Sequence, residues 1–427
     1  MFRKWLFLAS LLAGVAMVAG VAMAEDGSVF INYDGVHDDY FGGLAVAPNG
    51  NIFVGGAHNS PTGQFMAVSL LPTGDLDPSF GGGIVITSVG SKDNGASTAL
   101  VQPDGKRILA GSAFTKNKYN FALVRYNING TLDRTFGSNG SVTTSVSGGN
   151  DEIAGIALQP ADGKILATAF WGSQTVRYTS RGALDTTFGI KGIVVNSFPG
   201  GLMGQNRAVA LQGSSIIVGS DVFPPRNPFA LFRYDERGRL DTTFGNNGIT
   251  RSPSFSGQSG VNALAVALDG SIFAAGFYGG DDVLPAGPML VKFTPQGQLD
   301  TTFGEPVDPT DPMSEERTGY VLLGHLTGQA CFFAMKLQLN GQVVAAGKWN
   351  AGGAVVARFN ADGTLDTTFN GTGFFTQILP FYVYWDGMVV EPDGRIVIAG
   401  QGTNAQGTIV GIWVQRYNTD GTLDVTF

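Results

Sequence analysis

Cysteine, histidine and charged residues are all scarce in this sequence of 427 residues. The one cysteine, Cys331, cannot form an internal disulfide, so packing must stabilise the fold. The three histidines, His37, His58 and His325, fall in no metalloprotease or zinc-finger spacing. Lys and Arg number 26 against 34 Asp and Glu, which gives a net charge of −8 without a basic cluster. Nucleic acid is therefore not an expected partner, because phosphate binding needs concentrated positive charge.

Catalytic signatures are also lacking. The sequence contains no Gly-x-Ser-x-Gly elbow, no P-loop and no Cys-His zinc pattern. Its Gly-x-Gly occurrences, such as Gly81 to Gly83, lie in turns rather than in a nucleotide-binding context. We therefore assign no catalytic residue from the sequence.

Long apolar stretches are confined to the first residues. Arg3 and Lys4 precede an apolar run from Trp5 to Val21, and Ala22-Met23-Ala24 then supplies the small residues of a cleavage site. This pattern predicts a signal peptide over residues 1–24 and a mature chain that begins at Glu25. A retained membrane anchor is the alternative, since the run approaches the length of a short spanning helix. The expected location is outside a bacterial cytoplasm: secreted, periplasmic or on the cell surface. No transmembrane segment is expected after cleavage.

Glycine is abundant, with 63 residues, and internal repeats explain why. The pentapeptide Leu-Asp-x-Thr/Ser-Phe occurs seven times, at intervals of 52 to 66 residues. An apolar stretch, a turn and a second apolar stretch also recur seven times. The pentapeptides begin at Leu76, Leu132, Leu184, Leu240, Leu299, Leu365 and Leu423. The second signal begins at Leu44, Ala99, Ile156, Val209, Leu264, Met335 and Met388.

Each module is typical of four β-strands. In the second module we expect strands at Ala99–Gln102, Arg107–Gly111, Phe121–Tyr126 and Ser141–Ser145, with Asp104-Gly105 as a hairpin turn. Seven four-stranded units of this size predict a single all-β domain over residues 25–427, a seven-bladed β-propeller. A β-solenoid is the alternative fold, but its repeats are normally much shorter.

The two ends of the chain are predicted to close the ring. The seventh module stops at Phe427, before its fourth strand. The sequence from Asp26 to Phe30 resembles Asn139–Thr143, which follows an internal pentapeptide. We therefore expect the N-terminal segment from Asp26 to Asn32 to pair as the outer strand of the last blade, which removes an exposed sheet edge.

The repeat resembles that of a known family. Arg-Tyr-Asn-x-x-Gly-x-Leu-Asp-x-Thr-Phe stands almost whole at Arg125 to Gly137 and at Arg416 to Phe427, and Ser69 replaces the Arg in the first copy. This pattern resembles the bacterial delta-60 repeat family, an uncharacterised β-propeller module. The resemblance implies a propeller fold and an extracytoplasmic setting, and it implies no activity.

Residues that recur in every module are expected to be structural. The Asp of the pentapeptide is predicted to accept backbone N–H bonds in its own turn, and the Phe to fill the core. An Arg lies eight residues before this Asp, as Arg125 does before Asp133, so the two can form an ion pair. A solvent-facing Arg is the alternative.

Ligand binding is instead expected where the loops vary. The loops that lead into the innermost strands meet the loops between second and third strands at one mouth of the central channel. Asp39, Asn94 and Asp151 stand nine residues before a turn proline in three modules and offer oxygen donors suited to Ca²⁺. His37 and Trp385 are possible additions to this site. Simple solvation of the loops by polar residues is the alternative.

Two functional classes follow. The first, which we favour, is a non-catalytic binding or scaffold propeller, expected to be a monomer, whose partner is a small molecule, a glycan or a protein. The second is a metal-dependent propeller hydrolase or lactonase with a metal-bound water at the channel mouth.

The leader generates the first prediction. When the full chain is expressed in a bacterial host that exports it, the mature protein should begin at Glu25, because the cleavage site follows Ala24. Intact mass and N-terminal sequencing measure this. A protein that keeps Arg3 and Lys4 in the membrane fraction would contradict it.

Overall fold

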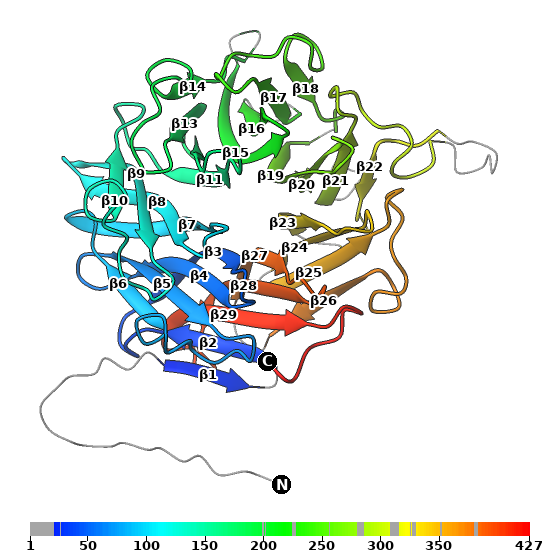
Figure 1. Ribbon diagram of the computed structural model, residues 1–427. Coiled ribbons are helices and arrows are strands. Elements are labelled where there is room, and N and C mark those ends of the chain that lie inside the picture. The colour runs from blue at the N-terminus through cyan, green and yellow to red at the C-terminus, as the bar shows by residue number, and fades with distance from the viewer. Residues whose placement is uncertain are drawn as a thin grey trace, which may run out of the picture.

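Seven sheets are arranged around a central axis in the computed structural model, which shows a closed ring (Figure 1). The structure describes residues 21–25, 27–198, 200, 202–223, 228–255, 257–279, 286–307, 316–324, 326, 330–350, 352–379 and 383–427. Each sheet is antiparallel, and in six of the seven sheets all neighbouring strands follow each other in the chain. The predicted seven-bladed β-propeller with four-stranded blades is confirmed. In this part of the chain, no helix is long and apolar enough to cross a membrane.

The first six blades each use four consecutive strands. Blades 1 to 3 contain β3 (Asp39–Val46), β4 (Ile52–His58), β5 (Gln64–Leu70), β6 (Ile84–Thr87); β7 (Lys92–Val101), β8 (Arg107–Thr115), β9 (Lys118–Tyr126), β10 (Ser141–Thr144); and β11 (Ile153–Leu158), β12 (Ile165–Ala169), β13 (Gln174–Tyr178), β14 (Ile193–Val195). Blades 4 to 6 contain β15 (Met203–Gln212), β16 (Ser215–Phe223), β17 (Ala230–Tyr234), β18 (Ile249–Arg251); β19 (Ser259–Val266), β20 (Ile272–Tyr278), β21 (Gly287–Phe293), β22 (Tyr320–Leu322); and β23 (Ala330–Leu337), β24 (Val343–Trp349), β25 (Gly353–Phe359), β26 (Phe374–Ile378).

The seventh blade joins the two ends of the chain. It contains β27 (Val383–Val390), β28 (Ile396–Thr403) and β29 (Val410–Tyr417), and β2 (Ser28–Asn32) is its fourth strand. In Figure 1, β2 lies beside β29, and the register pairs Val29 with Val414 and Ile31 with Ile412. The predicted closure by the N-terminal strand is therefore confirmed.

A fifth strand lies outside this closure. β1 (Val21–Glu25) pairs antiparallel with the outer edge of β2. Most of β1 belongs to the predicted leader, whose residues 1–20 lie outside the described residues. The ring itself is complete with β2 and does not need β1.

The pentapeptide turn is held by a cluster here called the clamp, which in blade 2 consists of Arg125, Asp133, Thr135 and Phe136. In blade 2, Asp133 Oδ1 accepts hydrogen bonds from the Thr135 N–H at 3.0 Å and the Thr135 hydroxyl at 2.7 Å. Arg125 Nε donates to Asp133 Oδ2 at 2.8 Å, and the guanidinium lies 4.4 Å from the centroid of the buried Phe136 ring. Desolvation raises the pKa of Asp133, but hydrogen bonds from Thr135 and Lys106 outweigh it and hold that pKa well below its usual range. The predicted structural role of this Asp and Phe is confirmed.

The clamp also joins neighbouring blades. Arg125 Nη1 donates to the Ser180 carbonyl oxygen in blade 3, 2.6 Å away. Blade 5 has Lys292 in place of the Arg, with its Nζ 2.9 Å from Asp300 Oδ2. In four further blades the arginine makes the same kind of bond to the next blade, and the bond from Arg416 joins blade 7 to blade 1. The equivalent donors and acceptors are Arg177 to Glu236, Arg233 to Pro295, Arg358 to Thr419 and Arg416 to Pro72.

Blade 1 lacks the clamp arginine and takes a cation from its neighbour. Ser69 stands in place of the Arg, and its hydroxyl donates to Asp77 Oδ2 at 3.1 Å. Arg107 of blade 2 occupies a position that is Ile or Val in the other copies. Its guanidinium lies 4.3 Å from the ring centroid of Phe80, the clamp phenylalanine of blade 1. Burial lowers the pKa of Arg107, and the charge of Asp77 opposes this effect.

The single cysteine lies in the innermost strand of blade 6. Cys331 is buried in β23. Burial raises the pKa of its thiol to about 12, which keeps the thiol protonated and unreactive.

The clamp generates a stability prediction. Asp185→Ala should lower the free energy of unfolding by about 3 kcal/mol or more, because it leaves the buried charge of Arg177 without its carboxylate partner. Chemical denaturation measures this difference. Asp104→Ala, at an exposed hairpin turn, is the control and should cost about 0.5 kcal/mol or less. Equal effects of the two substitutions would refute the structural importance of the clamp.

Ring closure generates another prediction. A mature chain without residues 25–33 should lose roughly 5 kcal/mol of stability, because burying each of Val29, Phe30 and Ile31 contributes about 1.5–3 kcal/mol. Thermal melting followed by circular dichroism measures the change. A chain that begins at Gly27 keeps β2 and is the control. An unchanged melting temperature in the longer deletion would contradict closure through β2.

Candidate functional site

The channel has two different mouths. Connections into the innermost strands and between second and third strands form one, here called the loop mouth. Hairpins between first and second strands and the pentapeptide turns form the other, the hairpin mouth. A cavity of about 910 Å³ opens at the hairpin mouth, lined largely by apolar strand ends such as Val101, Leu337 and Val390. The cavity at the loop mouth is smaller, about 350 Å³, and its lining includes the charged side chains of Arg207, Asp386 and Glu152.

A β-bulge interrupts every innermost strand near its start. In β3, for example, Phe41 pairs with Gly56 and Gly43 with Gly55, so Gly42 has no partner of its own. The seven bulged residues are Gly42, Ser97, Ala154, Arg207, Asn262, Phe333 and Asp386. All seven line one cavity of about 350 Å³ in the channel. The fold thus brings one residue from each blade to the same place.

These seven positions break the repeat. At Gly42 packing fixes the residue, because a Cβ there would lie 2.0 Å from the Ala96 carbonyl oxygen. Two other bulge side chains bond across blades: the Ser97 hydroxyl donates to the Ile153 carbonyl oxygen, and Asn262 Nδ2 donates to the Phe332 carbonyl oxygen at 2.8 Å. Equivalent backbone positions therefore carry small, polar, aromatic, cationic and anionic side chains. The clamp positions, in contrast, vary little.

Arg207 supplies positive charge to the cavity. Its Nε donates to Asp221 Oδ2 at 2.7 Å, and its guanidinium lies 4.5 Å from the ring centroid of Phe170. Burial raises the pKa of Asp221, and the charge of Arg207 opposes this effect. Among the described residues, no protein acceptor is seen for Arg207 Nη1 or Nη2, so two nitrogen atoms are available to a ligand.

Two carboxylates face the same cavity. Asp386 is exposed to the channel; partial desolvation by the surrounding protein raises its pKa, and the charge of Lys348 opposes this effect. Burial also raises the pKa of Glu152, against a hydrogen bond from Trp171. The cavity therefore combines a guanidinium with two partly desolvated carboxylates.

The predicted oxygen donors Asp39, Asn94 and Asp151 lie at equivalent positions, three residues before the bulge, but each forms its polar contacts with residues near it and not with the other two. Asp39 Oδ1 lies 2.6 Å from His58 Nδ1, and Asn94 Nδ2 donates to the Gly63 carbonyl oxygen at 3.0 Å. Asp151 Oδ2 accepts from the Val146 N–H at 2.7 Å. No contact joins the three predicted residues to each other in the described part of the chain, and all three are buried. A shared Ca²⁺ between them stays a prediction.

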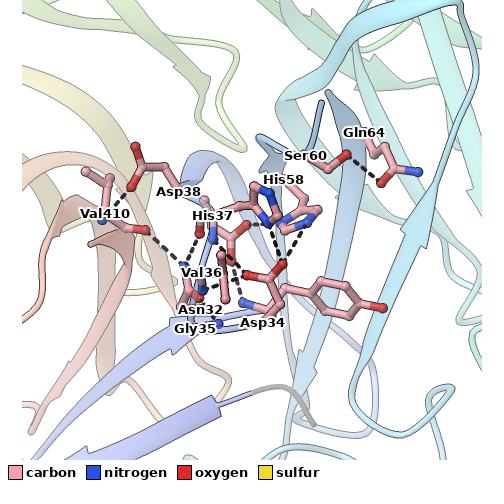
Figure 2. A network of polar contacts seen from close by, with 12 residues as sticks. Asn32, Asp34, Gly35, Val36, His37, Asp38, His58, Ser60, Gln64 and Val410 are labelled. Carbon is pink, nitrogen blue, oxygen red and sulfur yellow. Dashed lines mark hydrogen bonds and ion pairs between the residues drawn. The ribbon is translucent and has the colours of Figure 1, made fainter. Parts of the chain in front are cut away.

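The other two predicted residues lie apart. Trp385 is 1 % exposed and packs between blades 6 and 7, while the next residue, Asp386, lines the channel. His37 lies in a polar cluster with Asp34 and His58 (Figure 2). Sequence reasoning proposed neither Asp34 nor His58 as a ligand.

The polar cluster has short contacts. His37 Nδ1 lies 2.6 Å and His58 Nε2 lies 3.6 Å from Asp34 Oδ2 (Figure 2). Desolvation raises the pKa of Asp34, but hydrogen bonds from His37 and Val36 outweigh it and lower that pKa to about 2. Asp34 is thus a carboxylate at neutral pH.

The fold and the channel define a β-propeller of unknown function. Residues 102–136, 338–369 and 391–427 match a family described as "Domain of unknown function (DUF5122) beta-propeller", and these segments contain the clamps of blades 2, 6 and 7. The match supports an uncharacterised propeller repeat, but not the delta-60 name.

Comparison with other proteins adds little about function. Among solved structures, the β-propeller domain of Cps50 (Swd1) from Myceliophteria thermophila has 11 % sequence identity and a TM-score of 0.46, and the match covers 88 % of this chain and 96 % of that chain. No curated protein matches the sequence.

Proposed function

We propose that this protein is an exported, non-catalytic binding propeller that takes a small polar ligand in the cavity at the loop mouth. The observation that carries the proposal is the set of seven bulged residues, one per blade, which differ in chemistry where the backbone repeats. Binding residues usually vary on a constant scaffold. The leader-like N-terminus supports export, and a cavity of about 350 Å³ falls within the usual size of small-molecule sites, about 300–1,000 Å³.

The charges favour a zwitterionic ligand such as a free amino acid. Arg207 suits a carboxylate, since its Nη atoms can donate two parallel hydrogen bonds. Asp386 and Glu152 suit an ammonium group. The aromatic rings of Phe41 and Phe333 line the same cavity and can add cation–π attraction.

A metal-dependent hydrolase receives less support from this cavity. Within the described ranges, the group of three His, Cys, Asp or Glu side chains close enough to share an ion is Asp34, His37 and His58. None of these residues lines the cavity of the bulged residues. The binding function therefore fits the cavity better.

The proposal predicts that single charges control affinity. Free amino acids should raise the melting temperature of the mature protein, and neutral monosaccharides should not. Arg207→Gln and Asp386→Asn should each weaken binding at least about tenfold in calorimetric titration, because a hydrogen bond to a charged group contributes about 1.5–3 kcal/mol.

The control lies at the opposite mouth. Lys336→Gln removes a cation that lines the hairpin mouth and should leave affinity unchanged. Asp386→Asn keeps the shape of the side chain and tests the charge even if Arg207→Gln, which loses the bond to Asp221, unfolds. Affinity in both cavity variants that equals the affinity of the unaltered protein, or the absence of any amino-acid binding, would rule out the proposal.

A further inference from the structure

A second group of ligand-type side chains lies at the seam where the ring closes. Asp34 and His37 belong to the segment between β2, the last strand of blade 7, and β3, the first strand of blade 1. His58 is the final residue of β4. One ligand atom from each of these three side chains lies within 4.8 Å of the others (Figure 2). The cluster is separate from the channel cavity and independent of the proposed function.

Asp39 orients His58. Its Oδ1 lies 2.6 Å from His58 Nδ1, and its Oδ2 accepts the Tyr33 N–H at 2.5 Å. Asp39 is fully buried. In the tautomer of His58 whose Nδ1–H donates to Asp39, the lone pair of Nε2 is the one that a metal would take. A carboxylate behind the imidazole is the usual arrangement for a metal-binding histidine. The free Nε2 faces Asp34 Oδ2, 3.6 Å away.

Asp34 is oriented in the same manner. Its Oδ1 accepts the N–H groups of Val36 and His37, at 2.9 and 2.8 Å. The other oxygen, Oδ2, is thereby directed between the two imidazoles. The side chains of Asp34 and His37 are 20 % and 39 % exposed, so an ion can reach them from solvent.

We propose that Asp34, His37 and His58 form a binding site for a divalent transition metal of the Zn²⁺ type, with Asp39 as a positioning residue. Two imidazoles and one carboxylate suit Zn²⁺, which is four-coordinate, and water completes the set. Imidazole nitrogen selects against Ca²⁺ and Mg²⁺, which take oxygen ligands. His37 exchanges its bond with Asp34 Oδ2 for the metal when the ion binds.

The location gives the metal a structural consequence. Asn32 Nδ2 donates to the Val410 carbonyl oxygen at 3.1 Å, and the Val410 N–H donates to Asp38 at 2.9 Å. These bonds tie the segment that carries Asp34 and His37 to β29. A metal that also engages His58 of blade 1 links the closing blade to the first. Binding to the closed ring alone then stabilises it by mass action.

The test uses tag-free mature protein treated with a chelator and then dialysed. Zn²⁺ should bind with a stoichiometry of one in calorimetric titration and should raise the melting temperature, whereas Ca²⁺ and Mg²⁺ should do neither. Co²⁺ should give visible absorption bands of a nitrogen- and oxygen-ligated site. His37→Gln and Asp34→Asn, both partly exposed, should each weaken Zn²⁺ binding at least tenfold and remove the Co²⁺ bands.

Asp93→Asn is the matched control. Asp93 is an exposed acid near the start of β7, the innermost strand of blade 2, and its substitution should leave the Zn²⁺ affinity and the Co²⁺ spectrum unchanged. Zn²⁺ binding that is equally tight in His37→Gln and Asp34→Asn, or no Zn²⁺ binding by the unaltered protein, would overturn the proposal. Amino-acid titrations of the same variants should match the unaltered protein, so this result is independent of the channel site.

Discussion

The structure depends on the clamp, in which a cation binds an aspartate of its own turn and lies over a buried phenylalanine. A β-blade has two apolar faces, and it is stable only when neighbouring blades cover them. The clamp fixes the turn through Asp133 and its equivalents, and the same guanidinium reaches a carbonyl of the next blade. One arginine side chain therefore stabilises both the pentapeptide turn and the contact with the next blade. Blade 1 shows how strongly the cation is required, since Arg107 supplies it from a neighbouring strand where Ser69 cannot.

Repetition explains how much the sequence predicted. The number and order of the strands, the structural aspartates and the closure through β2 all follow from patterns that recur in register, and the structure agrees with them. The bounds were predicted less well, since the first strand of the second module begins at Lys92 and not at Ala99. The bulged residues were missed because a bulge is a property of strand pairing, which one strand's sequence does not reveal. A signal existed: each bulged residue lies two positions before the start of the second repeated stretch, in a column that differs in all seven copies. The shift from Trp385 to Asp386 arises from the same bulge.

The polar cluster at the seam was hidden for another reason. His58 lies 21 residues beyond His37 in the sequence, with β3 and the rest of β4 between them. Only the pairing of Asp39 with His58 in the first two strands of blade 1 brings the imidazole to Asp34. His37 and Asp39 were predicted as ligand-binding candidates only because they lie in a segment that leads into an innermost strand. The residues that they contact, Asp34 and His58, could be identified only from the strand pairing in blade 1.

Closure through β2 also has a consequence for how the protein is made. Gln415 donates to Ser28 across 387 positions, so the strand synthesised near the beginning pairs with one synthesised near the end. Until β29 has been synthesised, β2 has no strand to pair with in blade 7, and its apolar residues Val29, Phe30 and Ile31 are not buried. Contacts of such long range are formed late, because the entropy of closing so large a loop must be overcome first. If the chain is exported N-terminus first, β29 has to cross the membrane before β2 can pair with it and the ring can close. A chaperone that shields the apolar residues of β2 would then have to remain bound until β29 arrives.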